Sequence, residues 1–480
     1  MTELLDVSQV QVDPRVALVV PAALSRRRGL LAFARIEGEV CVACANPEDV
    51  AGQRALRRHF EEPVRFLAAE PLSLEAALAR TYGASNTLSA EPKLDDATSL
   101  CDELLRAAIL RRASDLHIDP RREGVLVRFR CDGVLEDYRT LDTSAFAGLM
   151  SRFKVLAGMD IAEKRAPQDG RFSYDYGGSH AVELRAATLP TKWGERLTLR
   201  LLALETEALT LERLGLAEEP RARVDRNLDR PHGLILVTGP TGSGKSTTLY
   251  AGLRRLIAQR PLNVITVEDP IEFDIDGVAQ VEVDSGDRVG FGRALRSMLR
   301  HDPDVIMIGE IRDADSAGVA IKAALTGHLV LSTLHTNTAP GAITRLVDMG
   351  VERYLVAATL RLVVAQRLAQ RLCQRCHSPR PLSAAEAALF GESSAAGATV
   401  YEAAGCLHCA GRGVSGRFGL FELLELEPEW TQRVIQGADE ADLVRAMREE
   451  GVPTLSQAAF RALLAGELSF SAAARAVTTW

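Results

Sequence analysis

The stretch that decides the fold is Leu234-Ile-Leu-Val-Thr-Gly-Pro-Thr-Gly-Ser-Gly-Lys-Ser-Thr-Thr-Leu249. Four apolar residues, 234–237, predict a buried strand, and a glycine-rich turn follows directly. The turn fills every position of the phosphate-loop pattern G-x-x-x-x-G-K-[ST]. Its residues that would contact a nucleotide are Gly239, Pro240, Thr241, Gly242, Ser243, Gly244, Lys245, Ser246 and Thr247.

The chemistry of this loop explains its spacing. Glycines let successive backbone N–H groups point into one concavity, and a helix that begins near Lys245 adds the positive end of its dipole. Lys245 would neutralise the β- and γ-phosphates, and the Ser246 hydroxyl would hold Mg²⁺. A glycine-rich turn without any ligand is the alternative, which the strand before the loop and the helical pattern after it disfavour. The loop therefore predicts binding of a nucleoside triphosphate, ATP being the usual one, with Mg²⁺.

The totals of the chain restrict its class. At 480 residues it is too long for one core, so we expect two to four domains. The net charge, 57 − 64 = −7, argues against a nucleic-acid partner. No apolar run reaches the roughly 18–20 residues that a membrane span needs, and the N-terminus lacks the basic-then-apolar order of a signal peptide. We expect a cytoplasmic protein without a membrane span.

Pattern and composition divide the chain into six segments. The first mixes short strands, expected over 15–21, 30–34 and 39–44, with helices; its Cys41 and Cys44 are expected to be core residues, because positions i and i+3 of a strand face opposite sides. The last is expected to be mostly helical. The predicted segments are 1–83 (a partner-docking domain), 84–97 (a polar linker), 98–225 (a second α+β domain), 226–372 (an α/β core with a parallel sheet), 373–410 (a four-cysteine module) and 411–480 (a helical region).

Acidic residues and histidines stand at strand ends in the α/β core. The apolar strand 263–267 leads to Glu268 and Asp269, and the strand 304–308 leads to Glu310. His328 precedes a further strand and His335 follows it. In an open parallel sheet, ligands bind beyond the carboxyl ends of the strands. One acid could therefore order Mg²⁺ through water while another deprotonates the attacking water.

Four of the eight cysteines form two C-x-x-C pairs, 373–376 and 406–409, separated by twenty-nine residues. Such paired knuckles are typical of a closed tetrahedral zinc site. Four thiolates leave no open position for a substrate, so the zinc would be structural. We expect Zn²⁺ on Cys373, Cys376, Cys406 and Cys409, with a helical insertion between the knuckles.

With these motifs in order, the chain resembles the cytoplasmic ATPases of type II secretion systems, with the type IV pilus assembly ATPases as close kin. The resemblance rests on Ala113-Ser-Asp-Leu-His-Ile-Asp-Pro120, Glu163–Gly170, Thr188–Arg196, the phosphate loop, the acidic stretch 266–272, the stretch ending in Gly309-Glu310, the histidine stretch 326–337 and the four cysteines. It implies a RecA-like ATPase core that follows a PAS-like second domain.

The resemblance also implies roles for individual residues. Glu268 would be the general base, Glu310 the acid on the metal side, and His328 the sensor of the γ-phosphate. From the pattern alone, Arg185 and Arg200 are surface arginines at strand ends, whereas by family position they reach the nucleotide from the second domain. Three further arginines match family positions near a subunit boundary: Arg296, Arg300 and Arg312.

The implied assembly is a homo-hexamer that couples ATP hydrolysis to pseudopilus assembly and export of folded proteins. It would dock through residues 1–83 to the cytoplasmic domain of an inner-membrane platform protein. Pilus extension shares every catalytic motif and stays the nearest alternative. A nucleic-acid translocase, which also combines phosphate loops with zinc ribbons, and a scaffold that does not hydrolyse nucleotide are more distant ones.

Overall fold

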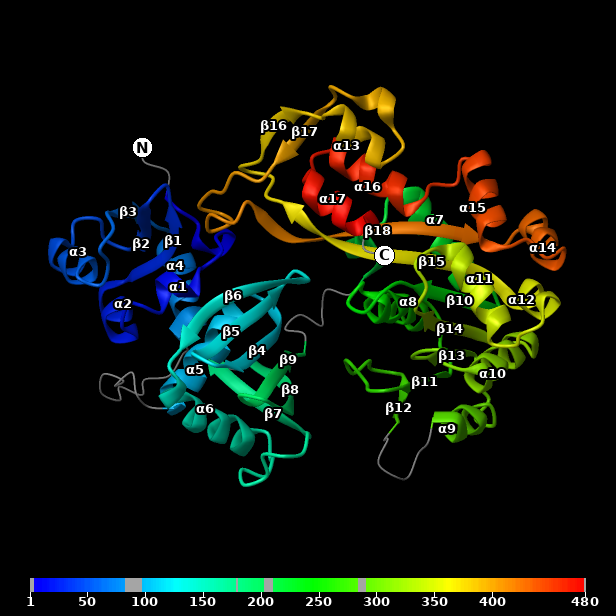
Figure 1. The fold of residues 1–480 in the computed structure, drawn as a ribbon, viewed down its shortest axis with the longest axis horizontal. Coiled ribbons are helices and arrows are strands. Elements are labelled where there is room, and N and C mark those ends of the chain that lie inside the picture. Colours follow the sequence, from blue (N-terminus) through cyan, green and yellow to red (C-terminus); the bar gives the residue numbers. More distant parts are fainter. Residues whose placement is uncertain (1–3, 83–96, 178–179, 203–209, 284–290, 479–480) are drawn as a thin grey trace. The chain divides into compact units, whose positions relative to one another are not determined.

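The computed structural model describes residues 4–82, 97–177, 180–202, 210–283 and 291–478 (Figure 1). The chain forms two compact units. The first comprises Met1–Leu204, Leu372–Pro379 and Glu402–Gly416, and the second comprises Glu205–Arg371, Arg380–Tyr401 and Arg417–Trp480. The predicted linker, 84–97, lies outside the described residues except for its last residue, which begins helix α5.

The first unit begins with a three-stranded sheet ordered β1-β2-β3, in which β1 and β2 are antiparallel and β2 and β3 parallel. The strands predicted over 30–34 and 39–44 are confirmed as β1 and β2. Cys41 and Cys44 are both buried, in two different hydrophobic clusters, as expected for opposite faces of a strand. The elements are η1 (Val7–Gln9), α1 (Pro14–Ala17), α2 (Ala22–Arg28), β1 (Leu30–Ile36), β2 (Glu39–Cys44), α3 (Val50–Arg57), β3 (Val64–Ala68) and α4 (Pro71–Tyr82).

The strand predicted over 15–21 is wrong, because α1 occupies its first part. The Asp13 side chain accepts a hydrogen bond from the N–H of Arg15, and Pro14 takes the first helical position. Both features start a helix. A short apolar run fits a buried helix as well as a buried strand, which is why the pattern misled.

The same unit contains a six-stranded sheet, ordered β6-β5-β4-β9-β8-β7, in which all neighbours are antiparallel. Leu116 and Ile118 of β4 face the core formed with α5 and α6, so Asp115 and His117 lie on the opposite face. The mixture of helices and strands agrees with the α+β class predicted for this part of the chain. The elements are α5 (Ala97–Leu110), β4 (Ala113–Arg121), β5 (Gly124–Cys131), β6 (Val134–Leu141), α6 (Thr143–Leu156), β7 (Gln168–Gly177), β8 (His180–Thr191) and β9 (Gly194–Leu201).

The second unit is built on a seven-stranded sheet ordered β12-β11-β13-β14-β10-β15-β18 (Figure 1). Its neighbours from β12 to β15 all run parallel. Continuous apolar runs are typical of parallel strands that are covered on both faces. The strands are β10 (Gly233–Thr238), β11 (Val264–Glu268), β12 (Ala279–Glu282), β13 (Val305–Ile308), β14 (Leu329–Leu334), β15 (Leu360–Leu372) and β18 (Val414–Glu425).

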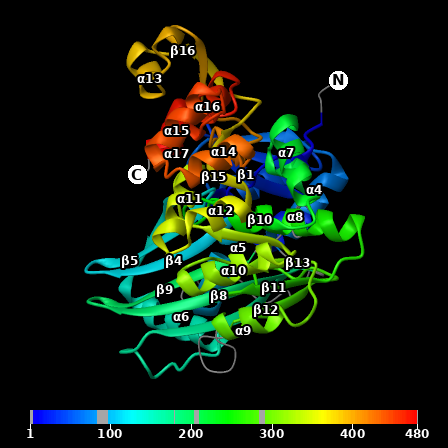
Figure 2. The same ribbon diagram turned by 90° about the vertical axis from the view of Figure 1, so that its right-hand side faces the viewer.

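Helices cover both faces of this sheet (Figures 1 and 2). Ile235 and Val237 of β10 pack in the core that contains α8, and Leu234 and Leu236 pack in the core that contains α10 and α11. The helices of this unit are η2 (Leu211–Leu214), α7 (Glu218–Leu228), α8 (Lys245–Gln259), α9 (Phe291–Met298), α10 (Ala314–Leu325), α11 (Ala339–Asp348), α12 (Arg353–Thr359), α14 (Pro428–Ile435), α15 (Glu440–Glu449), α16 (Leu455–Leu464) and α17 (Phe470–Thr478).

Two predictions for the C-terminal third need correction. The region 411–480 is not helical from its start, because β18 joins the large sheet before α14 to α17 follow. The insertion between the cysteine pairs is mixed rather than helical, with β16 (Ser378–Pro381), α13 (Ala384–Leu389), η3 (Ser393–Ala395) and β17 (Thr399–Glu402). Within the described ranges, no helix has the length and apolar character needed to cross a membrane.

Candidate nucleotide site and cysteine cluster

The phosphate loop lies between the end of β10 and the start of α8, as the sequence predicts. Gly244 has φ 86°, a left-handed conformation at the N-cap of α8 that favours glycine. A Cβ atom on Gly239 would lie 2.4 Å from the carbonyl oxygen of Gln366, so only glycine fits there. Thr241, Gly242 and Ser246 are exposed on the surface of the loop. The loop therefore presents the backbone and the hydroxyl that the motif assigns to phosphate and Mg²⁺.

Lys245 folds back onto its own loop. Its Nζ donates to the carbonyl oxygens of Gly239, at 2.9 Å, and Pro240, at 3.1 Å. Burial lowers the pKa of Lys245 to about 8, the positive charge of Arg367 adds to this, and the negative charge of Glu310 opposes it. Lys245 is thus held beside the loop, and a phosphate bound there would favour its charged form.

Glu268 ends β11 and is buried, with 4% of its surface exposed. One carboxylate oxygen accepts a hydrogen bond from the Tyr250 hydroxyl, which comes from α8. The other accepts from Thr266, at 2.6 Å, and from the Gln280 amide, at 3.1 Å. Burial, with the charge of Glu268 beside it, raises the pKa of Tyr250, so this hydroxyl keeps its proton and acts as a donor. The Glu268 carboxylate is therefore fixed in orientation by three side chains.

Glu310 lies at the adjoining strand end and is more exposed than Glu268. Its carboxylate is 3.1 Å from Arg312 Nε and 3.3 Å from His335 Nε2. Arg312 also reaches Asp269, at 3.1 Å. The strands β11, β13 and β14 are adjacent and parallel, which brings these residues to one edge of the sheet. The predicted convergence of the strand-end acids beside the phosphate loop is present.

His328 does not lie at that edge. It precedes β14, and its carbonyl oxygen accepts from the N–H of Gly233, the first residue of β10. The phosphate loop follows the last residue of β10, five residues and roughly 17 Å further along the strand. His328 instead faces the end of α10, with Nδ1 3.0 Å from the Ala323 carbonyl oxygen. The structure therefore does not support the expected γ-phosphate contact of His328 within its own chain; His335, at the other end of β14, occupies the edge that holds the loop.

Arg185 and Arg200 are directly paired across β8 and β9 of the first unit. With Asp169 and Arg171 they line a hollow of about 480 Å³ on the sheet. Arg200 Nε is 3.0 Å from Asp115, which orients it. Arg296 and Arg300 lie in and just after α9 of the second unit, where the Arg300 guanidinium donates to the Arg296 carbonyl oxygen at 3.3 Å.

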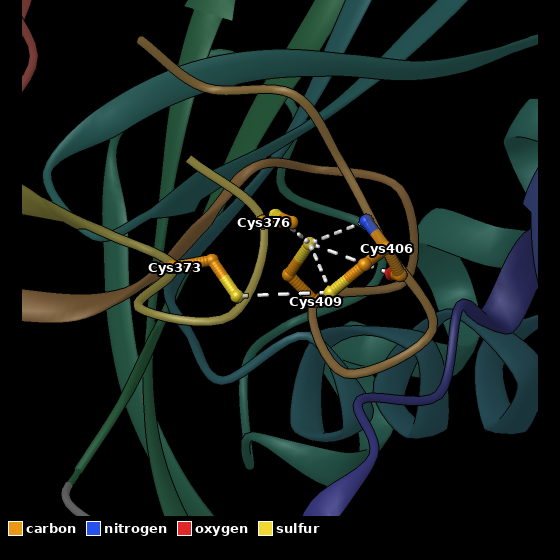
Figure 3. A group of neighbouring side chains, drawn as sticks. All are labelled: Cys373, Cys376, Cys406 and Cys409. Carbon is orange, nitrogen blue, oxygen red and sulfur yellow. Dashed lines mark hydrogen bonds between the residues drawn. The ribbon is translucent and has the colours of Figure 1, made fainter. Parts of the chain in front are cut away.

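The four predicted cysteines converge from two loops of the first unit (Figure 3). All four Sγ atoms lie within 4.8 Å of one another. The pairs 373–406, 376–409 and 406–409 are each 3.8 Å apart, too far for a disulfide bond. Tetrahedral zinc with bonds of about 2.3 Å sets its sulfurs roughly 3.8 Å apart, so the spacing fits zinc. The backbone N–H groups of Cys406 and Gly413 donate to Cys409 Sγ.

Comparison with known proteins then decides the family. The family model described as type II/IV secretion system protein matches residues 93–475. The chain belongs to this family. The first 88 residues of this secretion-family protein match the model of the MshEN domain.

Relatives of this secretion-family protein cover almost its whole length. Type II secretion system protein E of Pseudomonas aeruginosa is 40% identical over 474 residues, which cover 93% of this chain and 94% of the relative. The type IV pilus assembly ATPase PilB of Myxococcus xanthus is 35% identical, and the match covers 96% of this chain and 86% of the relative. The crystal structure of the pilus retraction motor PilT with bound ADP is similar with a TM-score of 0.54 and 27% identity, over 78% of this chain and 96% of that one. The chain is an ATP hydrolase of the secretion ATPase family.

Several residues of the site in this secretion ATPase were not predicted from the sequence. Tyr250, Gln366 and Arg367 contact the loop or its acids, and no local motif marks them. His335 was visible as a residue that follows a strand, and the rule that ligands bind at carboxyl ends of parallel strands would have selected it over His328.

Proposed function

We propose that this secretion ATPase is the hexameric motor of a type II secretion system, which couples ATP hydrolysis to pseudopilus assembly and protein export. The observation that carries the proposal is the 40% identity to a type II secretion system protein E across 93% of the chain. Pilus assembly is the second candidate, since the relative named for it covers an even larger share of this chain at lower identity. The net charge of −7 speaks against a nucleic-acid translocase.

The proposed site combines the phosphate loop with the strand-end side chains. Residues 239–247 bind the nucleotide phosphates, with Lys245 pairing the β- and γ-phosphates. Ser246 and Glu310 would hold Mg²⁺, which would supply charge neutralisation on the phosphates. Glu268, oriented by its three hydrogen bonds, accepts the proton of the attacking water. The γ-phosphate contact first assigned to His328 passes to His335, because His335 lies beside Glu310.

In the proposed ring, Arg185 and Arg200 complete the site of a nucleotide, and Arg296, Arg300 and Arg312 lie near a subunit boundary. The arginine-lined hollow supports this, because an oxyanion is the ligand that clustered guanidinium groups select. Arginines supplied in trans contribute about 10³–10⁵ to the rate of phosphoryl transfer. Turnover per subunit should therefore rise with protein concentration as the ring assembles. A turnover that is already high and flat down to monomer concentrations would refute the ring.

We assign structural Zn²⁺ to the four cysteines on the strength of their sulfur spacing. The domain boundaries predicted from the sequence carry over as part of this proposal, with residues 1–83 docking to the cytoplasmic domain of an inner-membrane platform protein. The protein is accordingly placed in the cytoplasm, at the inner membrane through that partner.

A deletion of the gene separates the two candidate functions. Loss of secreted proteins from the medium with intact pili is the result expected for the secretion motor. Loss of pili with normal secretion would assign the protein to pilus assembly. Complementation with Lys245→Ala serves as the control, because it should restore protein level but not export.

A further inference from the structure

Strand β15 brings two polar residues against the phosphate loop from a distant part of the chain. β15 runs parallel beside β10, with Val237 opposite Val364 and Thr238 opposite Ala365. The loop begins directly after Thr238, and Gln366 and Arg367 come directly after Ala365. The register of the two strands therefore places this pair alongside the loop.

Gln366 contacts both ends of the loop. Gln366 has 1% of its surface exposed, and its Oε1 accepts a hydrogen bond from Thr248 Oγ1 at 2.7 Å. Thr248 lies in the first turn of α8, three residues after Lys245. At the start of the loop, the Gln366 carbonyl oxygen abuts Gly239, and near its end the Gln366 amide nitrogen lies 2.9 Å from where a Cβ of Gly244 would be.

Arg367 continues this contact toward the strand-end histidine. It is 6% exposed, and it donates to the Gln366 carbonyl oxygen at 3.1 Å and to the Asn337 side-chain oxygen at 3.0 Å. Asn337 comes two residues after His335. Arg367 thus links the segment after β14 to the strand that supports the loop.

We propose that Gln366 is a positioning residue for nucleotide binding, which holds the first turn of α8 through Thr248 and so keeps the loop N–H groups aimed at phosphate before the nucleotide arrives. Preorganised donors bind an anion more tightly because no ordering cost remains at binding. The inference rests on the proposed binding of nucleotide phosphates by residues 239–247. It assigns no contact with the nucleotide to Gln366 itself.

The test is a double-mutant cycle on nucleotide affinity with the full chain. The variants Gln366→Met and Thr248→Val keep side-chain volume and remove the hydrogen bond, singly and together. A fluorescent ADP analogue measures Kd, and thermal unfolding without nucleotide measures the midpoint. We expect each single variant to raise Kd about tenfold, as the loss of one buried hydrogen bond does. The double variant should also raise it about tenfold, because both changes remove the same interaction.

Each other outcome has a definite meaning. Single variants with Kd within about twofold of the parent, or a double variant weakened by the product of the singles, would overturn the proposal. A change in Kd that parallels the change in the unfolding midpoint, and that appears equally in the exposed control Gln432→Met, would mean that Gln366 has a purely structural role. That result would also overturn the proposal. If Gln366→Met does not fold, Thr248→Val alone must still weaken binding. Absence of analogue binding by the parent protein would instead refute the phosphate site.

Discussion

His335 Nε2 lies 3.3 Å from a carboxylate oxygen of Glu310, which joins the ends of β14 and β13 beside the phosphate loop. Burial and the nearby charge of Lys245 lower the pKa of His335 below its usual 6.5, so the ring is neutral at physiological pH. A neutral imidazole can donate one hydrogen bond and accept another. In the proposed site, this pair would distinguish a nucleotide with a third phosphate from one without it.

Replacement of His335 should slow ATP hydrolysis far more than replacement of His328. We expect His335→Ala to lower the rate of phosphate release about a hundredfold, the usual cost of removing one donor from a charge-stabilising site. His328→Ala should stay within about twofold of the parent, because His328 contacts the end of α10. Steady-state release of phosphate from Mg·ATP measures both. A larger loss in His328→Ala than in His335→Ala would contradict the placement of the site.

The two acids should separate in their dependence on Mg²⁺. Glu310→Gln removes a proposed metal ligand, so it should raise the Mg²⁺ concentration needed for half-maximal hydrolysis about tenfold or more. Glu268→Gln removes the proposed base, so it should lower kcat by about 10²–10⁴ at unchanged Mg²⁺ dependence. Hydrolysis measured over a Mg²⁺ titration at saturating ATP checks both. The opposite pattern would exchange the two roles.

Nucleotide binding should take up a proton near pH 8. Because the pKa of Lys245 in the free protein is about 8, this lysine is about half protonated at that pH. Bound phosphate favours the charged form, so binding should take up about half a proton at pH 8 and much less at pH 7. Calorimetry in Tris and in HEPES, whose ionisation enthalpies differ, gives the proton number. Equal heats in the two buffers at pH 8 would show that Lys245 is already charged in the free protein.

The same pKa shift has a defined effect on stability. Between pH 8 and 10.5 the unfolded chain keeps the Lys245 proton while the folded chain has lost it, so the unfolded state binds more protons. The contribution of Lys245 therefore raises the free energy of unfolding as the pH rises through that window. Lys245→Met removes the contribution and should flatten this part of the profile, as followed by urea unfolding.

Removal of zinc should loosen the N-terminal segment as well as the knuckles. The Gln11 N–H donates to the His408 carbonyl oxygen at 3.0 Å, and His408 Nδ1 lies 3.1 Å from the Gln9 carbonyl oxygen. Zinc of this type supplies on the order of 10 kcal/mol to local folding. A chelator or Cys409→Ser should thus abolish the bound zinc and speed proteolytic cleavage within residues 1–83.

The matched control for zinc is Cys41→Ala, which removes a buried cysteine outside the cluster. It should retain one zinc per chain by metal analysis. Full zinc content in Cys409→Ser would contradict the four-cysteine assignment, and unchanged proteolysis after complete metal loss would contradict the link to the N-terminal segment.

Local spacing in the sequence was enough to predict where most residues of the candidate site lie. The loop at 239–246, the strand-end acids Glu268 and Glu310, and the cysteine pairs are each encoded within a few residues, since a strand followed by a turn fixes where its next side chain lies. Gln366 lies some 120 residues after the loop. Its position depends on β15 taking the place beside β10, and sheet order is set by packing between distant segments rather than by any local pattern.

The wrong prediction for β18 has a local cause. The residues that form β18 were predicted to belong to a helical region, because the apolar residues of 418–424 alternate too weakly to distinguish strand from helix. In the fold it carries Glu422, buried, which accepts from the N–H groups of Ala339 at 2.7 Å and Leu455 at 3.0 Å. This single carboxylate therefore caps two helices far apart in the sequence, and only the folded chain reveals why an acid belongs there.

Residues beside the second cysteine pair also pack in the hydrophobic core of the N-terminal segment. Leu407, between its cysteines, and Ala410, just after them, pack in the same hydrophobic cluster as Val7, Phe33 and Tyr82. A chain shortened at the N-terminus would leave these two apolar side chains facing water. In a member of the family that lacks the first 83 residues, we therefore expect polar residues at these two positions, or another protein that covers them.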